Sequence, residues 1–234
     1  MTTKTVSLKI DEHEITAQEG KSILETAIEN GIDIPHLCFL AGLTKTGACR
    51  LCIVELKGQA KLFASCSTPI SDGMEVITNS EKLKAYRKNT IQLLLSERTH
   101  VCSVCVANKN CELQALADKL GVEHVAFERE WTSENVDSSH PFLVIDRNRC
   151  ILCTRCVRVC DEIEGVHALD LKLRGKDSQI IVDFDDSWDK AASCTSCRKC
   201  AKVCPVGAIY VEGEPLSETK DTGIADFVLS RRKK

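Results

Sequence analysis

The 15 cysteines of this chain are its most reactive residues, and eight of them form two copies of one pattern. In each copy the cysteines are separated by two, two and three residues. The copies are Cys150, Cys153, Cys156, Cys160 and Cys194, Cys197, Cys200, Cys204, the second followed by Pro205. Thiolates at this spacing wrap cubic clusters of four irons and four sulfides, so the pattern predicts two 4Fe–4S clusters.

The two runs resemble a two-cluster bacterial-type ferredoxin, in which the fourth cysteine of each run reaches the other cluster. The resemblance implies one ligand set of Cys150, Cys153, Cys156 and Cys204, and a second of Cys194, Cys197, Cys200 and Cys160. Two features depart from that pattern: Asp161 follows the first run, and a long inserted segment separates Cys160 from Cys194. The alternative is a pair of zinc sites, but zinc sites rarely use overlapping runs of four cysteines.

A second group of cysteines lies nearer the N-terminus, with a close pair at its centre: Cys38, Cys49, Cys52 and Cys66. Four thiolates in this order suit a 2Fe–2S cluster, although the first gap is longer than in plant-type ferredoxin. Gly42 and Gly47 in that gap would let backbone N–H groups approach the sulfurs and raise the reduction potential. The alternative for Cys66 alone is a buried thiol in the core.

The remaining three cysteines, Cys102, Cys105 and Cys111, cannot complete a four-iron site without a fourth ligand. Their spacing and the sequence Cys-Glu-Leu-Gln resemble a segment of complex I and of iron–iron hydrogenases, which ligates its cluster with one histidine and three cysteines. In that family the histidine usually stands where this chain has Arg98. The resemblance favours His100, and His124 is the competitor. A neutral imidazole would leave the cluster less negative than four thiolates would.

The elements that must position the N-terminal ligands follow from hydrophobic periodicity. Alternation predicts strands from Thr5 to Ile10 and from His13 to Ala17. Ser22 and Glu25 form a capping box that begins a helix ended by Gly31. Its predicted buried stripe is Leu24, Ala27 and Ile28. A hairpin followed by a helix is the opening of a β-grasp fold.

Further elements are predicted between and after the cysteine groups. They are a turn at 71–73 with a short strand, a helix from Ser80 to about Leu95, a helix from Cys111 to Leu120, a strand at 142–146, a hairpin of 169–173 and 179–184, and an edge strand after Pro205. Leu83, Tyr86, Ile91, Leu94 and Leu95 are expected to pack in the core or against another subunit.

Together these signals predict an α+β protein with an N-terminal β-grasp 2Fe–2S domain, a small helical 4Fe–4S segment ligated by one histidine and three cysteines, and a C-terminal two-cluster ferredoxin domain. The expected boundaries are 1–80, 81–140 and 141–215, with a tail at 216–234. Five basic residues near the cysteine runs are expected to be solvated, or to screen cluster charge or receive a partner: Arg155, Arg158, Arg198, Lys199 and Lys202. Trp131 is expected to serve packing.

Composition limits the classes of function. The net charge of −3 argues against a nucleic-acid role. The start resembles no signal peptide and no run of 18 apolar residues occurs, which predicts a cytoplasmic protein without membrane spans. Phosphate-binding glycine motifs are absent. The three cluster groups use all 15 cysteines, so no thiol remains for nucleophilic catalysis. The chain is therefore expected to carry single electrons and to have no catalytic site of its own.

The order of the three modules resembles the N-terminal region of complex I and of iron–iron hydrogenases. Chain length, the segment around His100 and the sequence from Arg149 to Gly165 are similar to the small diaphorase subunit of the bidirectional, NAD-reducing nickel–iron hydrogenase. The resemblance implies one 2Fe–2S and three 4Fe–4S clusters, and a partner subunit that binds FMN and NAD. It also implies partnership with a small iron–sulfur and a large nickel–iron hydrogenase subunit.

Two alternatives remain at this point. The same relay could serve another NADH-linked enzyme, such as a formate dehydrogenase, an iron–iron hydrogenase or a complex I-like assembly. The chain could instead be an iron–sulfur redox sensor. A sensor usually needs one labile cluster and an output domain, and four cluster sites without a DNA-binding motif argue against it.

Overall fold

The computed structural model describes residues 4–129, 133–214, 216 and 224–232. Trp131 lies outside these residues. The chain divides into two compact units, each described here by itself. Unit 1 comprises Met1–Phe39 and Lys45–Thr90, and unit 2 comprises Leu40–Thr44 and Ile91–Lys234.

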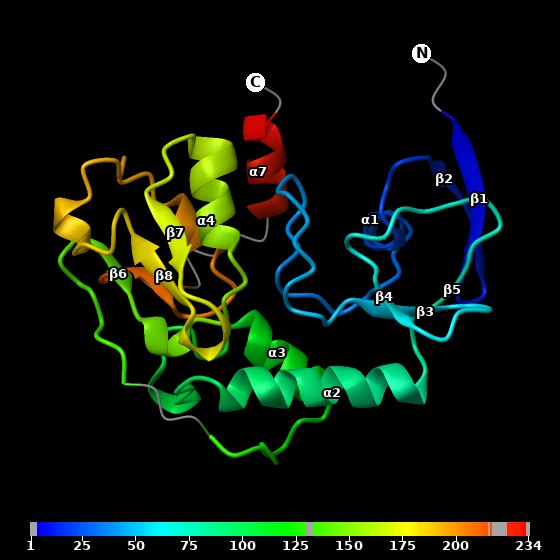
Figure 1. Ribbon diagram of the computed structural model, residues 1–234, viewed down its shortest axis with the longest axis horizontal. Helices are drawn as coiled ribbons and strands as arrows, with labels where there is room; N and C mark the ends of the chain where they lie inside the picture. Colours follow the sequence, from blue (N-terminus) through cyan, green and yellow to red (C-terminus); the bar gives the residue numbers. More distant parts are fainter. Residues whose placement is uncertain (1–3, 130–132, 215, 217–223, 233–234) are drawn as a thin grey trace. The chain divides into compact units, whose positions relative to one another are not determined.

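Unit 1 is built on a mixed five-stranded sheet in the order β2-β1-β5-β3-β4 (Figure 1). Its strands are β1 Thr5–Ile10, β2 His13–Gln18, β3 Ile53–Leu56, β4 Leu62–Ala64 and β5 Glu75–Ile77. β1 and β5 run parallel, whereas the other neighbours are antiparallel. The predicted opening hairpin is confirmed. β3 and β4 were not predicted, and they are the strands that flank the cysteines of this unit.

Helix α1 (Ile23–Glu29) follows the hairpin and begins as its capping box predicts. The Ser22 side chain accepts from the Glu25 N–H, and the Glu25 carboxylate accepts from the Ser22 N–H. Leu24 and Ala27 are fully buried, as expected. Ile28 is 47% exposed, so its placement in the buried stripe was wrong. The following Gly31 has a φ of 72°, which ends the helix at little conformational cost.

Helix α2 (Glu81–Ser96) contributes residues 81–90 to unit 1 and residues 91–96 to unit 2. The Ser80 hydroxyl caps it by accepting from the Leu83 N–H at 3.2 Å. Leu83 and Ile91 are fully buried, which confirms core packing for them. Tyr86 is 52% exposed and is not part of the core. Its place on the inward face is taken by Arg87, one residue later and 3% exposed.

Unit 2 consists of short elements joined by cysteine-bearing loops. In chain order they are η1 Cys102–Val104, α3 Glu112–Lys119, β6 Leu143–Ile145, η2 Arg147–Arg149, α4 Arg155–Val159, a π turn η3 Cys160–Glu164, β7 Leu169–Lys172, η4 Gly175–Asp177, β8 Gln179–Val182, η5 Trp188–Lys190, α5 Lys199–Val203, β9 Ile209–Val211 and α7 Ile224–Arg232. The helix predicted after Cys111 and the strand predicted at 142–146 are confirmed as α3 and β6.

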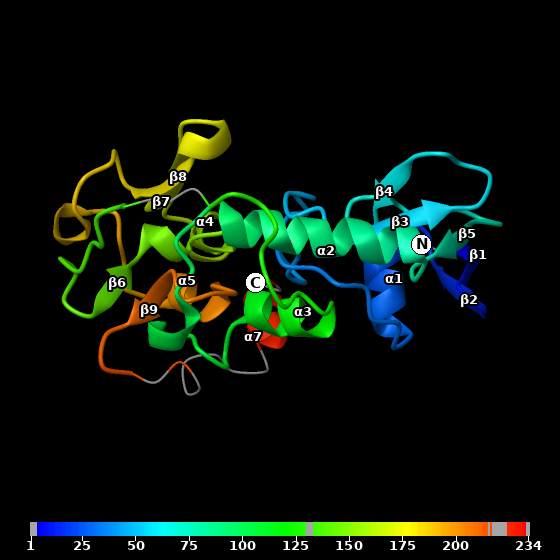
Figure 2. The same ribbon diagram turned by 90° about the horizontal axis from the view of Figure 1, so that it is seen from below.

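Two strand pairs frame the cysteine runs. β6, which leads into the first run, pairs antiparallel with β9, which leaves the second run (Figure 2). This pairing brings the two runs together although they are far apart in sequence. β7 and β8 form the hairpin predicted within the segment between the runs, with Leu169 opposite Val182.

A small apolar cluster closes one side of unit 2. Leu40 and Leu43 pack with Val159 of α4, Val203 of α5 and Val228 of α7. Helix α7 lies beside α4 (Figure 1). Segment 40–44 therefore belongs to unit 2, although in sequence it lies between Cys38 and Cys49.

Across the residues with described positions, none of the helices is both long and apolar enough to cross a membrane.

Candidate iron–sulfur centres

The four cysteines predicted to hold the 2Fe–2S cluster converge inside unit 1. Cys38, Cys49, Cys52 and Cys66 are all buried. The Cys38 thiol contacts those of Cys49 and Cys66, and the Cys52 thiol contacts that of Cys66. The Cys38 N–H points at the Cys49 sulfur at 3.4 Å, and the Cys49 N–H at the Cys38 sulfur at 3.5 Å. The site thus has the four thiols and the backbone donors that such a cluster needs.

The sheet edge and a tight loop create this convergence. Cys52 directly precedes β3, and the Cys52 carbonyl accepts from the Ser65 N–H next to Cys66 at 2.9 Å. Gly47 (φ 62°) and Arg50 (φ 55°) turn the loop around Cys49 through left-handed conformations. A glycine suits the position of Gly47, because it adopts a positive φ at little conformational cost.

Arg87 supports the Cys52 strand and was missed in the sequence. Its guanidinium donates to the carbonyls of Leu51 and Ile53 at 3.1 and 2.7 Å, on either side of Cys52. Burial lowers the pKa of Arg87. Its spacing could have indicated its burial, because Arg87 lies four residues from both Leu83 and Ile91 and so on the same face of the helix.

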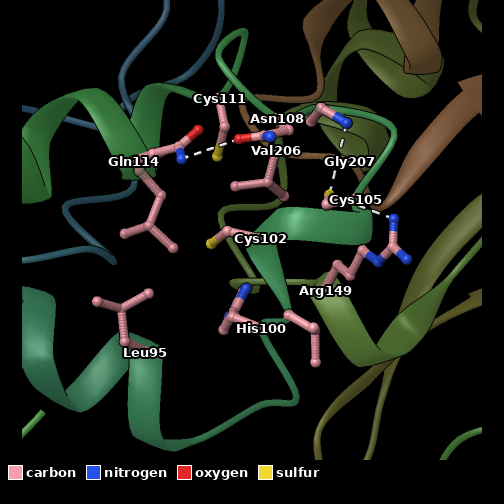
Figure 3. Close-up of a pocket in the computed structure, with 13 residues that line it drawn as sticks. Leu95, His100, Cys102, Cys105, Asn108, Cys111, Gln114, Arg149, Val206 and Gly207 are labelled. Atoms are coloured by element: carbon pink, nitrogen blue, oxygen red, sulfur yellow. Dashed lines mark hydrogen bonds between the residues drawn. The ribbon is translucent and has the colours of Figure 1, made fainter.

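In unit 2, His100 and three cysteines line one cavity (Figure 3). Cys102 lies on η1, Cys105 ends η1 and Cys111 caps α3. Leu95, Leu113, Val206 and Gly207 complete its apolar wall, and Arg149 and Gln114 add polar groups. His124, the competing ligand, is exposed and lies outside this lining.

The His100 ring has the hydrogen bonding and the charge that a metal-binding imidazole needs. Nε2 is buried without a hydrogen-bond partner, whereas the Leu94 carbonyl accepts a hydrogen bond from the ring. The ring therefore donates through Nδ1 and keeps the Nε2 lone pair free. Burial lowers the pKa of His100 to about 4, so the imidazole is neutral at pH 7 and able to bind metal.

The residues after Cys105 hold the ligand loop in place. The Gln114 amide oxygen accepts from the Lys109 N–H at 2.8 Å, and its amide nitrogen donates to the Asn108 side chain at 3.1 Å. Leu113 is buried, and Glu112 pairs with Arg155 through two contacts of 2.7 and 2.9 Å. The Cys-Glu-Leu-Gln sequence thus supplies one predicted ligand, Cys111, and three residues that hold the loop in place. Arg98 is buried and donates to the Ser178 carbonyl, outside the cavity lining.

The two cysteine runs form two further cavities, each with the crossed membership that the ferredoxin pattern predicts. Cys150, Cys153, Cys156 and Cys204 line one, whose wall includes Ile145, Ile180 and Ile209. Cys160, Cys194, Cys197 and Cys200 line the other, whose wall includes Leu143, Leu169 and Trp188. Apolar side chains thus form part of each wall beside the sulfurs.

Both runs bend through left-handed residues at equivalent positions. These are Leu152 and Thr154 in the first run and Ser196 and Arg198 in the second, with φ of 52°, 57°, 55° and 61°. Non-glycine residues enter this region at a cost of about 1–2 kcal/mol each. The bend turns backbone donors inward, and the Leu152 N–H points at the Cys150 sulfur at 3.4 Å. The strain is concentrated where the ligands must converge.

Burial keeps the thiols of the first run protonated in the absence of iron. It raises the pKa of Cys150 to about 11 and that of Cys153 to about 12. Iron binds thiolates, so metal binding here must release protons. No three His, Cys, Asp or Glu side chains within the described ranges are close enough to share a single metal ion.

The basic residues near the runs are less solvated than expected. Arg155 and Arg158 are 3% and 7% exposed, so their assignment to solvated surface was wrong. Arg158 donates to the Cys153 carbonyl and to the Thr44 carbonyl. Arg198 stacks on Phe142 and pairs with Glu214, and Lys199 pairs with Glu164. Lys202 is exposed.

A tryptophan beside the second run was also missed. The Trp188 indole N–H points at the Cys194 sulfur at 3.4 Å, and the side chain is 2% exposed. His140 supports the same loop, because its Nδ1 accepts from the Leu143 N–H and its Nε2 contacts the Ser196 hydroxyl. No local sequence signal indicates these long-range contacts.

Three family models match consecutive parts of the chain. A 2Fe-2S iron-sulfur cluster binding domain matches residues 3–81, and an NADH-ubiquinone oxidoreductase-G iron-sulfur binding region matches 87–126. The ferredoxin-like domain of NADH-quinone oxidoreductase subunit 3 matches residues 140–210. The α+β fold with one 2Fe–2S domain and further 4Fe–4S-binding domains is confirmed at this level.

Curated relatives extend this similarity across the chain. The chain is 35% identical over 227 residues to the NADPH-Fe(3+) oxidoreductase subunit alpha of Geobacter sulfurreducens, which covers 95% of this chain and 26% of that protein. It is 33% identical over 218 residues to the NADP-reducing hydrogenase subunit HndD of Solidesulfovibrio fructosivorans, covering 91% and 37%. The chain thus spans roughly a quarter to two fifths of the length of these curated relatives.

A solved structure matches over nearly its full length. It is a chain of the NAD+-reducing [NiFe]-hydrogenase in the H2-reduced state, with 35% identity and a TM-score of 0.84. The match covers 93% of this chain and 91% of that one. The chain belongs to this family of iron–sulfur electron-transfer subunits. An NADH-quinone oxidoreductase component of Rhizobium meliloti is a further relative, 34% identical over 207 residues that cover 87% of this chain and 24% of that protein. The chain is therefore a subunit of an oxidoreductase.

Proposed function

We propose that this subunit relays electrons between a partner that binds FMN and NAD and a nickel–iron hydrogenase module. The observation that carries the proposal is the near-complete match, in both directions, to a chain of the NAD+-reducing [NiFe]-hydrogenase. Other relatives share this iron–sulfur part within much longer chains, so the match covers only 26% and 37% of their length.

The proposed cofactors are one 2Fe–2S cluster and three 4Fe–4S clusters, which supply one-electron reduction and oxidation. The residues proposed to hold them are the 15 cysteines in the sets given above, with His100 as the fourth ligand beside Cys102, Cys105 and Cys111. The free Nε2 of His100 supports this set. The domain boundaries at 80, 140 and 215 and a cytoplasmic location are proposed on the sequence alone.

Contacts within unit 2 support an order for the relay. The ligand set of His100 lies next to that of Cys150, because Arg149 reaches Cys105 and the Glu112 N–H donates to the carbonyl of Pro205, which follows Cys204. The set of Cys150 lies next to that of Cys194, since α4 carries Cys156 and leads into Cys160, while α5 carries Cys200 and leads into Cys204. The set of Cys150 is therefore the middle one.

A second candidate is the same relay in an enzyme without nickel. Relatives named NADPH-Fe(3+) oxidoreductase and NADH-quinone oxidoreductase favour it. In both candidates this chain does the same work, and the partner subunits decide between them.

An anaerobic purification of the tagged chain from its native cells separates the candidates. The purified assembly is assayed for FMN, nickel and molybdenum, with an untagged strain as the control. FMN with nickel is expected. FMN without nickel would move the relay to the second candidate, molybdenum would point to a formate dehydrogenase, and the absence of FMN would overturn both.

A further inference from the structure

Arg149 belongs by sequence to the first cysteine run, but its side chain serves another ligand set. It is the residue before Cys150 and the last of η2. Its Nη1 donates to the Cys105 sulfur at 3.2 Å, and it lines the cavity of His100 (Figure 3). A positive group thus lies against a proposed ligand of the neighbouring cluster.

The guanidinium is held in this position from its other side. Arg149 Nε lies 2.9 Å from the Asp146 carboxylate, and the two side chains are 20% and 10% exposed. The Asp146 N–H donates to the Ala208 carbonyl at 2.7 Å, which fixes this residue to the exit of the second run. Two anchored contacts leave the guanidinium little freedom to leave the sulfur.

Two backbone segments also lie close to the Cys105 sulfur. The Ala107 N–H points at its sulfur at 3.4 Å. Gly207 faces it so closely that a Cβ there would lie 2.9 Å from that sulfur. The sulfur therefore lies between Arg149 and these two backbone segments, with the cavity on its open side.

A donor that is both charged and hydrogen-bonded to a ligand sulfur stabilises the reduced cluster more than the oxidised one, because reduction adds negative charge to the sulfurs. His100 acts in the same direction, since its neutral ring replaces a thiolate. Both effects raise the reduction potential of one ligand set, while the adjacent set of Cys150 has four thiolates.

We propose that Arg149 is a positioning residue that raises the reduction potential of the cluster held by His100, Cys102, Cys105 and Cys111. This inference rests on the proposed ligand set. It adds that Arg149 sets part of the difference in reduction potential between that cluster and the neighbouring one. Arg149 thereby biases the distribution of electrons between the two proposed clusters. Asp146 holds the guanidinium in the required place.

The test is an EPR-monitored redox titration of the full chain in three forms: unaltered, Arg149→Met and Arg149→Lys. The signal of interest is the one lost in His100→Ala. In Arg149→Met its equilibrium constant for reduction should fall about tenfold, which is a shift of about 59 mV for a one-electron couple. Arg149→Lys should give a smaller shift, because an ammonium keeps the charge but cannot bridge Asp146 and Cys105 as a guanidinium does.

Arg147→Met is the matched control. Arg147 lies on the same 3-10 turn, carries the same charge and donates to the Ile180 carbonyl instead of a sulfur. Its replacement should leave the potential of the His100 cluster unchanged. The inference is overturned if Arg149→Met keeps its full iron content and an unshifted potential, or if Arg147→Met shifts it equally. If the unaltered chain gives no signal that depends on His100, the proposed ligand set itself fails.

Discussion

At the scale of single residues, the proposed histidine ligand has one ring nitrogen that makes no hydrogen bond. His100 keeps Nε2 free because the Leu94 carbonyl occupies the other ring nitrogen. Its burial keeps the ring neutral and removes competition from protons down to pH values near the lowered pKa of about 4. Such an arrangement is costly in an apolar cavity unless the free nitrogen gains a metal.

Replacing His100 tests this interpretation directly. His100→Ala should remove or alter the EPR signal of one four-iron cluster and leave the other signals in place, because the remaining ligand sets share no residue with it. His124→Ala is the matched control and should leave the whole spectrum unchanged. An unchanged spectrum in His100→Ala, with a changed one in His124→Ala, would transfer the ligand role to His124.

Gly207 makes a second prediction at this scale. The backbone of Gly207 is not left-handed, so its conformation would allow alanine. The space would not, because an added Cβ would lie 2.9 Å from the Cys105 sulfur and 3.0 Å from the Ala107 Cβ. Gly207→Ala should therefore lower the iron content of the His100 cluster severalfold. Gly213→Ala is the control, because its added Cβ meets nothing within 4 Å and its only cost is the left-handed backbone, about 1–2 kcal/mol. Equal iron contents in the two variants would contradict the account.

The convergence of the cysteine sets was more predictable than the residues that contact their sulfurs. Thiolates such as Cys150 and Cys204 follow a spacing rule, because a short loop can turn only certain positions toward one cluster. The sulfur donors Trp188 and Arg149 follow no such rule, since each reaches its sulfur through tertiary packing. The burial of Arg155 was likewise hidden, because its carboxylate partner Glu112 lies far away in the sequence.

At the scale of elements, periodicity predicted what is locally determined. β1, β2, α1 and the β7–β8 hairpin appear where alternation, capping and turn residues place them. β3 and β4 were missed because each is short and is stabilised by strand partners rather than by a local pattern. Ile28 was placed wrongly in the buried stripe, and Tyr86 lies outside the core, which leaves a subunit contact as its other predicted role. A helical stripe defines a direction, whereas burial depends on how far the neighbouring elements reach.

The segment 40–44 is stabilised by elements that no local pattern connects to it. Leu43 packs in the cluster of Val159, Val203 and Val228, and the Thr44 N–H donates to the Glu162 carboxylate at 2.9 Å. Leu43→Ala should lower the free energy of unfolding of unit 2 by about 2–4 kcal/mol, because it leaves a cavity in a closed cluster. The measurement is urea unfolding of the full chain together with amide exchange of residues 40–44.

Leu173→Ala is the matched control for this change. Leu173 is 63% exposed in the turn that follows β7, so its truncation should change the free energy of unfolding by less than about 0.5 kcal/mol. The packing assigned to segment 40–44 would be wrong if both variants unfolded alike and exchange in 40–44 did not accelerate.

At the scale of the whole molecule, the chain lacks the aromatic mass of a conventional core. Aromatic residues make up 4% of it, and many of its buried positions are cysteines. Binding of iron to those thiols therefore contributes to folding itself and not only to electron transfer. The chain shares its iron–sulfur part with relatives whose names record different substrates.

In the proposed assignment, every cysteine of this chain binds iron in one two-iron cluster or in one of three four-iron clusters. Mössbauer spectroscopy of the anaerobic, 57Fe-labelled full chain tests it most directly, in the oxidised and the reduced states. About one seventh of the iron should give the spectrum of a 2Fe–2S cluster and the rest that of 4Fe–4S clusters, all of it responding to reduction. Iron of a single cluster type, or a stable chain that holds zinc in place of iron, would contradict the account.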